Sequence, residues 1–199
     1  MTDETMIEYL SKVLKERKKT ENPGVGFTPS AVLVPLYEKE GQYHLLYTLR
    51  SLQVRDHKGQ ISFPGGVQET SDSNLIQTAL RESEEEIGLK PGSVEIIGEL
   101  EDILTPTQYR ITPFVGLIPH PYSFTLNAIE IAELVEVPLN FLLEPANLCY
   151  GRPDIEDCQW DTPFFRYERH TIWGATGRIT KELVELIQQN TLLGQKKSG

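Results

Sequence analysis

The pattern of apolar and polar residues divides the chain into helical and extended stretches. Apolar positions recur at helical spacing over residues 3–19, and Asn22-Pro23-Gly24 ends this segment. Two apolar runs follow, Ala31 to Tyr37 and Tyr43 to Leu49, and the polar stretch between them contains Gly41. This arrangement is typical of a β-hairpin. We therefore expect an N-terminal helix and then a hairpin.

The remaining segments continue this mixture of helices and strands. A second helix is expected over residues 74–87 with Gly88 as its C-cap, and a last helix over about 176–190 before a fraying QKKSG tail. Further strands are predicted over 94–100, 114–118 and 134–137, with a short helix in PLNFLLEP. The apolar residues of the second helix, which we expect to pack on the sheet, are Ile76, Ala79, Leu80 and Ile87. The whole pattern predicts an α/β (α+β) sandwich.

Length and charge narrow the classes of function. The 199 residues suit one domain, and 19 Lys and Arg against 29 Asp and Glu give a net charge of −10. Such an acidic chain is a poor candidate for binding nucleic acid or an anionic membrane. The sequence has no apolar stretch near the roughly 18 residues of a membrane helix and no secretory signal pattern. We expect a cytoplasmic protein.

The cysteines and histidines do not suggest a soft-metal site. Cys149 and Cys158 stand nine positions apart, without C-x-x-C spacing, and are expected to be spare thiols. The four histidines are scattered and do not form an H-E-x-x-H motif. Zinc chemistry of these types is therefore excluded.

Three carboxylates in the second predicted helix carry the strongest chemical signal. Glu82 and Glu86 are one turn apart on one face, and Glu85 lies beside them, about 60° from Glu82. Three like charges on one arc repel each other, and a hard divalent cation such as Mg²⁺ or Mn²⁺ offsets the repulsion. The alternative is a solvated acidic face. Two neighbours favour the metal: Arg81 directly before the cluster, and the upstream glycine pair Gly65-Gly66, which allows close backbone approach.

This region resembles the Nudix box, G-x5-E-x7-R-E-U-x-E-E-x-G-U, in which U is a bulky apolar residue. Gly66, an acidic residue and then Arg81-Glu82-x-x-Glu85-Glu86-x-Gly88-Leu89 carry the resemblance. There are three departures from the box: Asp72 stands for the first Glu, one extra residue separates it from Arg81, and polar Ser83 occupies a U position.

The upstream segment is similar to the coenzyme A (CoA) pyrophosphatase branch of that family. The branch signature is L-L-T-x-R-[S/A]-x3-R-x3-G-x3-F-P-G-G, and Arg50-Ser51-x3-Arg55-x3-Gly59-x3-Phe63-Pro64-Gly65-Gly66 matches it at every position. Leu46-Tyr47-Thr48-Leu49 fits the first part, with Tyr47 in place of the second Leu. Members of this branch also tolerate the longer loop and the Asp. The ending His170–Thr176 is similar too, so the resemblance spans roughly residues 28–190.

The resemblance implies a fold, an activity and a set of site residues. The fold is a Nudix-type α/β/α sandwich with a mixed β-sheet over residues 25–199, with the helix of residues 1–24 packed on it. The activity is hydrolysis of CoA or acyl-CoA to 3′,5′-ADP and (acyl-)4′-phosphopantetheine. Arg81 organises the loop through Asp72 or a helix glutamate. The implied metal ligands are Glu82, Glu85, Glu86 and the Gly66 carbonyl. The implied substrate-binding residues are Arg50, Arg55, Lys58, Gly65 and Gly66, with His57 in the same basic group.

Several alternatives remain open from the sequence. The substrate is CoA, or another nucleotide such as ADP-ribose, a dinucleotide or a nucleoside triphosphate, and the third alternative is a non-catalytic Nudix-fold binding module. A homodimer is common in this fold, but the sequence leaves the oligomeric state open. Thr105, Thr107 and Tyr109 are either pocket residues or ordinary core and surface residues. The general base is a metal-bound glutamate or one of five other carboxylates: Glu99, Glu101, Asp102, Glu130 and Glu133.

Overall fold

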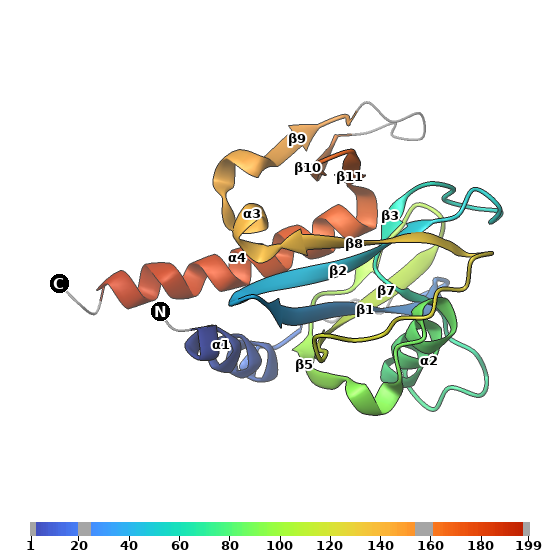
Figure 1. Ribbon diagram of the computed structural model, residues 1–199, viewed down its shortest axis with the longest axis horizontal. Helices are drawn as coiled ribbons and strands as arrows, with labels where there is room; N and C mark the ends of the chain where they lie inside the picture. The colour runs from blue at the N-terminus through green and yellow to red at the C-terminus, as the bar shows by residue number, and fades with distance from the viewer. Residues whose placement is uncertain (1–2, 20–24, 154–160, 197–199) are drawn as a thin grey trace.

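The computed structural model describes residues 3–19, 25–153 and 161–196 (Figure 1). Cys158 lies outside these residues, and Cys149 is a free, half-buried thiol. The four α-helices are α1 (Asp3–Glu16), α2 (Leu75–Ile87), α3 (Leu139–Leu143) and α4 (Gly174–Lys196). The strands are β1 (Thr28–Lys39), β2 (Gln42–Arg50), β3 (Ile61–Ser62), β4 (Gly65–Val67), β5 (Glu95–Glu99), β6 (Ile103–Leu104), β7 (Tyr109–Leu117), β8 (Ile131–Pro138), β9 (Leu148–Gly151), β10 (Thr162–Tyr167) and β11 (His170–Ile172).

The main sheet is mixed and has eight strands. Its central order is β3-β2-β1-β7-β5, while β4 pairs with β1, β6 with β7 and β8 with β2. The predicted hairpin is confirmed, because β1 and β2 pair antiparallel with Lys39 opposite Gln42. The long pair β1 and β7 runs parallel, from Thr28 opposite Tyr109 to Leu36 opposite Leu117. A crossover with α2 joins these two strands, as parallel pairing requires.

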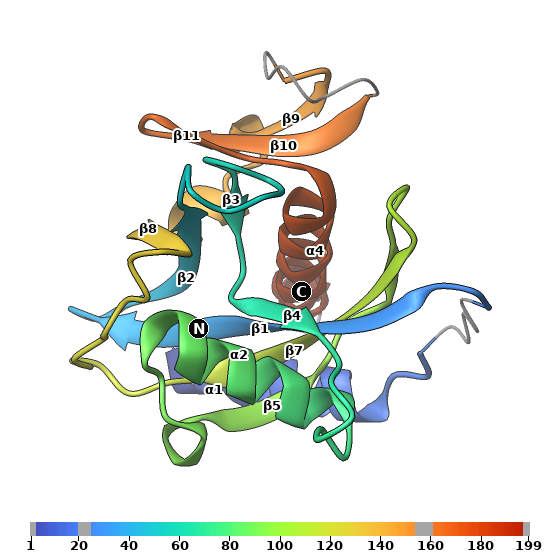
Figure 2. The ribbon, with the colours of Figure 1, turned by 90° about the vertical axis from the view of Figure 1, so that its right-hand side faces the viewer.

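The two faces of the sheet are covered by different helices. Alternation along β1 sends Val34 and Leu36 into a core that contains Leu10 of α1 and Leu183 of α4. Leu33, the residue directly before Val34, points to the other face and enters a second core with Ala79 and Ile87 of α2. Figure 2 shows α2 in front of β1, with α1 and α4 behind. The predicted α/β/α sandwich with a mixed sheet is therefore the observed architecture.

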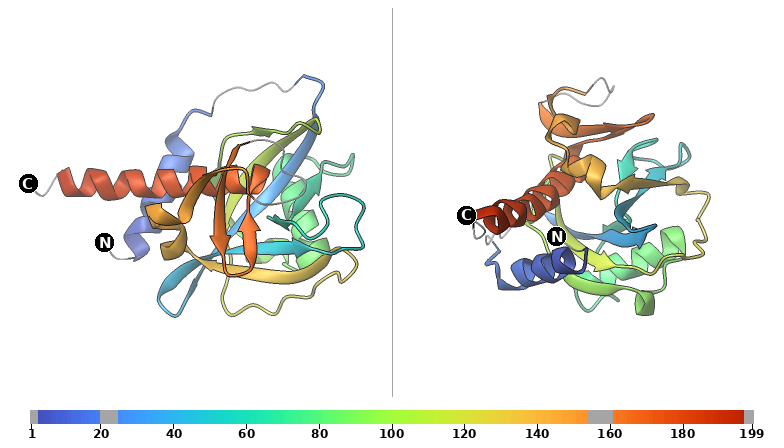
Figure 3. Two further views of the ribbon diagram at one scale, coloured as in Figure 1. Left: turned by 90° about the horizontal axis from the view of Figure 1, so that it is seen from above. Right: turned by 60° about the vertical axis from the view of Figure 1, so that its left-hand side comes forward.

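A second, three-stranded sheet, β11-β10-β9, was not predicted from the sequence. It stacks beyond β3 and β8 (Figure 3). Arg169, in the turn between β10 and β11, forms an ion pair with Glu133 of β8 over 2.6 Å. Just after β11, the hydroxyl of Thr176 in α4 donates to the Ile61 carbonyl of β3 over 3.2 Å. The strands of this second sheet have three to six residues and are too short for an alternating apolar and polar pattern to be recognised.

The second predicted helix is confirmed with both of its caps. The side chain of Asn74 accepts a hydrogen bond from the Gln77 amide, and Gly88 ends the helix in the left-handed conformation, with φ of 71°. The prediction that Ile76 packs on the sheet is wrong, because this residue is 37% exposed. It lines an open cavity of about 350 Å³ whose other lining residues include Phe114 and Thr112 of β7.

Element boundaries differ from the sequence-based expectations at several ends. α1 stops at Glu16, before residue 19, and α4 continues to Lys196, so the predicted fraying from Gln195 is wrong for two residues. β7 begins at Tyr109, which therefore stands in a strand. Since polar residues can extend an element already anchored by tertiary packing, periodicity alone locates its ends poorly. No helix in the described part of the chain has the length and apolar content needed to cross a membrane.

Candidate active site

Glu86 is the most deeply buried carboxylate of α2, with 2% exposure. Its Oε2 accepts a hydrogen bond from the Gly65 amide at 3.3 Å, and Arg50 Nη1 lies 3.5 Å from its Oε1. Burial raises the pKa of the Glu86 carboxyl to about 8, although Arg50 and the Gly65 amide act in the opposite direction. These two partners therefore compensate only part of the cost of placing a negative charge here.

Glu82 lies against the second glycine of the β4 segment. A Cβ atom at Gly66 would stand 2.5 Å from the carboxyl carbon of Glu82, so residue 66 must lack a side chain for this contact. Glu82 is half-buried, and burial raises its pKa as well. Glu82 and Glu86 thus both face the Gly65-Gly66 backbone.

Arg81 connects the loop to the carboxylates of the helix. Its Nε and Nη2 donate to the two carboxylate oxygens of Asp72, both at 3.0 Å, and Nη2 also donates to the Val67 carbonyl at 3.1 Å. Its Nη1 donates to Glu82 at 2.8 Å and to Glu85 at 3.2 Å. These bonds to Arg81 lower the pKa of Asp72 to about 2 despite the burial of that carboxyl. The two partners expected for Arg81, Asp72 and a helix glutamate, are engaged together.

The structure accommodates the departures from the Nudix box locally. Asp72 Oδ2 also accepts bonds from the Glu69 amide at 2.9 Å and the Thr78 hydroxyl at 3.0 Å, so the shorter side chain still ties the longer loop to α2. Ser83 is fully buried, and its hydroxyl donates to the Ala79 carbonyl at 2.6 Å. A small residue whose hydroxyl is satisfied within the helix thus replaces the bulky apolar one.

Glu85 is separate from the other two box glutamates. Its side chain is 57% exposed and is bonded to Arg81. Within residues 3–19, 25–153 and 161–196, no three His, Cys, Asp or Glu side chains are grouped closely enough to hold a metal ion. The structure therefore brings Glu82 and Glu86 together at the glycine pair, with Glu85 on the adjoining side of the helix.

Within the basic segment from Arg50 to Lys58, the contact with the box carboxylates is made by Arg50, the last residue of β2. Arg50 contacts Glu86, and its Nε is buried with no hydrogen-bond partner. Arg55, His57 and Lys58 are exposed, and His57 Nδ1 lies 3.0 Å from Gln60 Oε1. In the described part of the chain, Arg55 and Lys58 have no side-chain partner.

Among the five further carboxylates, Glu130 is the one whose charge acts on the site. It raises the pKa values of Glu82 and Glu86, after the larger effect of burial. The turn that contains it is joined to α2 by the bond from the Asn127 amide to the Glu86 carbonyl, 2.9 Å long. Sequence reasoning did not distinguish Glu130 from the other four, and its neighbouring Asn127, a turn-forming residue, is the only signal we find.

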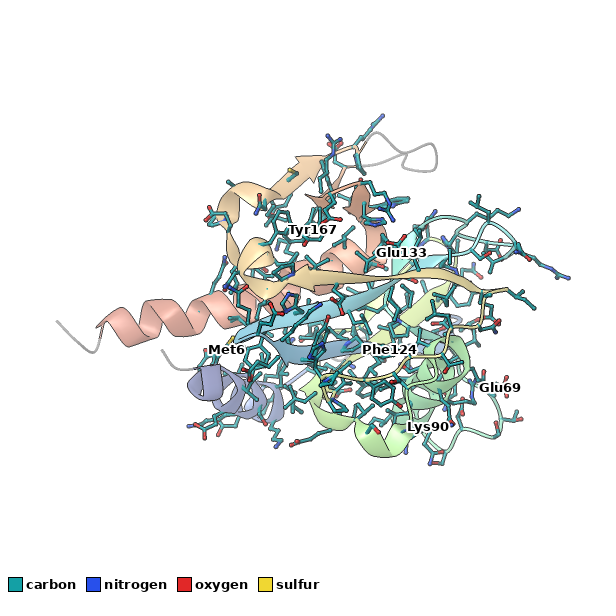
Figure 4. The ribbon with its side chains drawn as sticks, viewed as in Figure 1. Met6, Glu69, Lys90, Phe124, Glu133 and Tyr167 are labelled. Carbon is teal, nitrogen blue, oxygen red and sulfur yellow. The ribbon has the colours of Figure 1, made fainter. Side chains whose placement is uncertain are left out.

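The remaining four carboxylates have other partners. Figure 4 shows Glu133 between β8 and the second sheet, where it pairs with Arg169. The other three pair with cations of the segment that follows α1: Glu99 and Asp102 with Lys19, and Glu101 with Arg17. Lys19, Glu99 and Asp102 line the open cavity together with residues of β7. The box carboxylates lie elsewhere, since Glu86 is bonded to Gly65 of β4. This cavity is therefore separate from the candidate active site.

Thr105 and Thr107 belong to the turn between β6 and β7, and Tyr109 is the first residue of β7. The Thr105 and Thr107 hydroxyl oxygens are 3.0 Å apart, and the Tyr109 amide donates to Thr105 Oγ1 at 3.0 Å. These polar groups are used within the turn itself.

Comparisons with known proteins agree with the architecture and the box. A family model described as the NUDIX domain matches residues 27–163. The Nudix hydrolase NudL of Photorhabdus laumondii, called uncharacterized, is 38% identical over 159 residues, covering 80% of this chain and 84% of the relative. The NudL of Escherichia coli O7:K1, also called uncharacterized, is 34% identical over 186 residues, covering 90% and 93%.

A solved structure supports the fold alone. The MutT/nudix family protein from Enterococcus faecalis superposes with a TM-score of 0.51 at 15% identity, over 95% of this chain and 74% of that one. The family model and the relatives extend over most of the chain, including the box helix and the glycine pair. The protein belongs to the Nudix hydrolase family, whose members act on small nucleotide derivatives and generally use divalent metal ions.

Proposed function

We propose that the protein hydrolyses the pyrophosphate bond of CoA or acyl-CoA with a divalent metal ion, giving 3′,5′-ADP and 4′-phosphopantetheine or its acyl form. One observation carries the proposal. Arg50, the first arginine of the CoA-branch signature, extends to within 3.5 Å of the box residue Glu86, while its Nε has no hydrogen-bond partner. The signature loop and the acidic helix, 36 residues apart at these positions, thus meet at one site.

Glu82, Glu85, Glu86 and the Gly66 carbonyl are the proposed ligands of Mg²⁺ or Mn²⁺. Oxygen donors of this kind suit hard dications. The raised pKa of Glu86 supports the proposal, because a buried carboxyl with too little positive charge nearby gains from a cation. When bound, the metal supplies Lewis-acid stabilisation of phosphoryl charge and a more acidic water.

The protein's own residues would bind and orient the substrate. A net charge of −10 repels a diphosphate, so local cations must reverse the potential at the site. Arg50 and the exposed, unpaired Arg55 and Lys58 are the proposed phosphate-binding cations, with the Gly65 and Gly66 amides as further donors. Arg81 is a positioning residue, since its bonds to Asp72, Glu82 and Glu85 hold the carboxylates in place.

We further propose Glu130 as the general base that takes a proton from the attacking water. Its electrostatic effect on Glu82 and Glu86 distinguishes it from the other four carboxylates. We also propose that the protein is cytoplasmic, that it forms a homodimer, and that residues 25–199 are one Nudix domain on which the segment 1–24 packs. Sedimentation velocity tests the dimer, which a monomer at micromolar concentration would contradict.

A substrate panel tests the proposed activity. We expect kcat/KM for CoA and acetyl-CoA to exceed that for ADP-ribose, a dinucleoside polyphosphate and a nucleoside triphosphate by at least about tenfold, with Mg²⁺ or Mn²⁺. Chromatography should identify 3′,5′-ADP and 4′-phosphopantetheine, and ¹⁸O water should label one phosphate. Faster turnover of ADP-ribose or a dinucleotide would assign another Nudix substrate. Binding without turnover of any compound would indicate a non-catalytic module.

A further inference from the structure

Two large aliphatic side chains beside the candidate active site are directed into solvent. Four large hydrophobic residues of the described chain are more than half exposed: Val25, Leu52, Ile129 and Tyr150. Leu52 is 74% and Ile129 67% exposed. The backbone bond from the Ser51 amide to the Glu130 carbonyl, 2.7 Å long, places the turns that carry these two residues side by side. Isolated exposed hydrophobics are common, but a neighbouring pair at a site requires an explanation.

Local hydrogen bonds hold both turns in place. The Gly59 amide donates to the Arg50 carbonyl at 3.1 Å and closes the loop, and a Cβ atom at Gly59 would lie 3.4 Å from a methyl group of Leu52. On the other side, the Ile129 amide donates to Asn127 Oδ1 at 3.2 Å. The two exposed side chains therefore belong to turns whose backbone is held by hydrogen bonds, and both are accessible to a ligand.

The pair also flanks the acidic helix. Leu52 lies two residues after Arg50, which contacts Glu86, and Ile129 precedes Glu130. The Asn127 amide donates to the Glu86 carbonyl at 2.9 Å, so the turn of Ile129 rests on the last turn of α2. The segments that carry the two side chains are thus both bonded to Glu86, one through Arg50 and the other through Asn127.

Resting on the function proposed above, we infer that Leu52 and Ile129 form an apolar contact for the pantoyl unit of CoA. This unit carries a carbon with two methyl groups directly beside the diphosphate ester. ADP-ribose and dinucleotides carry a hydroxylated sugar at the same place. The contact would therefore favour the CoA arm over a sugar and contribute to substrate specificity.

The size and surroundings of the pair favour this small ligand over a protein partner. The segments that carry the two side chains are otherwise mainly polar and include Arg55, Lys58 and Glu130. A stable protein interface buries roughly 800 Å² on each side, far more than two side chains provide. Two methyl groups match an apolar contact of this extent.

A cycle of two substrates and two proteins tests the inference. The substrates are CoA and an analogue whose two pantoyl methyl groups are replaced by hydrogen atoms, and the proteins are wild type and the double variant L52S/I129S. We expect wild type to prefer CoA by about tenfold in kcat/KM, at roughly 0.8 kcal/mol per buried methyl-sized group. In the double variant the preference should fall below about threefold, while the rate on the analogue is unchanged.

Matched variants separate this role from general damage to the site. V25S removes an equally exposed aliphatic side chain next to the start of β1, which lies at the opposite side of the view in Figure 2 from the start of β8. It should keep the full preference, and so should L52M, which retains an apolar side chain. An unchanged preference in L52S/I129S, or an equal loss on both substrates, would overturn the inference. Failure of wild type to hydrolyse CoA would instead reject the proposed function.

Discussion

The Glu86 carboxyl is almost fully buried, and its folded pKa of about 8 lies well above that of an ordinary glutamate near 4.3. Between about pH 4.3 and 8, the folded, metal-free protein therefore keeps a proton on Glu86 that the unfolded chain has already lost. The stability of the metal-free protein should fall as the pH rises through this window, by on the order of a few kcal/mol.

Glu86→Gln removes both the free-energy cost of ionising a buried carboxyl and a proposed metal ligand. In EDTA at pH 8.5 we expect the variant to melt at a higher temperature than wild type, because no charge is buried, while hydrolysis with Mg²⁺ falls at least about 100-fold. Glu84→Gln is the matched control, since Glu84 pairs with exposed Lys90 at the surface of the same helix. Parallel stability profiles of wild type and E86Q between pH 4 and 9 would contradict the assigned burial.

A second substitution at the residue scale tests the general base. We expect Glu130→Gln to lower kcat by about 10²-fold or more, because the amide cannot accept the proton. Glu133→Gln, which alters the pairs with Arg169 and His170 away from the site, should retain the kcat of wild type. An unchanged kcat in E130Q would exclude Glu130 and leave a box glutamate as the base.

At the scale of the element, α2 depends on its C-terminal cap. Gly88 has φ of 71° and donates to the Ser83 and Glu84 carbonyls, and a Cβ atom there would stand 3.0 Å from Thr125. We expect Gly88→Ala to lower the free energy of unfolding by about 1–2 kcal/mol. Gly92→Ala is the control, because its Cβ would meet no atom within 4 Å. Equal urea midpoints for the two variants would refute this reading of the cap.

At the scale of the whole molecule, α1 is built into the core of the main domain. Leu10 is fully buried in the cluster that contains Leu183 of α4, and Arg17, just after α1, bonds to Glu101 and lies 2.8 Å from Glu182 of α4. We expect Leu10→Ala to cost about 2–5 kcal/mol while unfolding remains one cooperative transition. Lys12→Ala on the exposed face should be nearly neutral. A separate early transition in calorimetry would indicate that α1 folds independently.

The sequence by itself determined the elements whose information is local. The spacing of apolar residues located the hairpin and the helix from Asn74 to Gly88, because period and caps are set within a few residues. The box and the signature likewise identified the residues now found around Gly65 and Gly66, since their identities are read directly from the chain.

Only the tertiary structure decided which distant residues meet. The proximity of Arg50 to Glu86, the electrostatic effect of Glu130 on the site and the second sheet depend on how the chain closes over long separations in sequence. The exposure of Ile76 has the same origin, because the open cavity beside the first turn of α2 is lined by residues from distant parts of the chain, such as Lys19 and Phe114. Apolar residues at helical spacing indicate that one face of a helix is suited to burial, but the elements packed against the helix determine whether that face is covered.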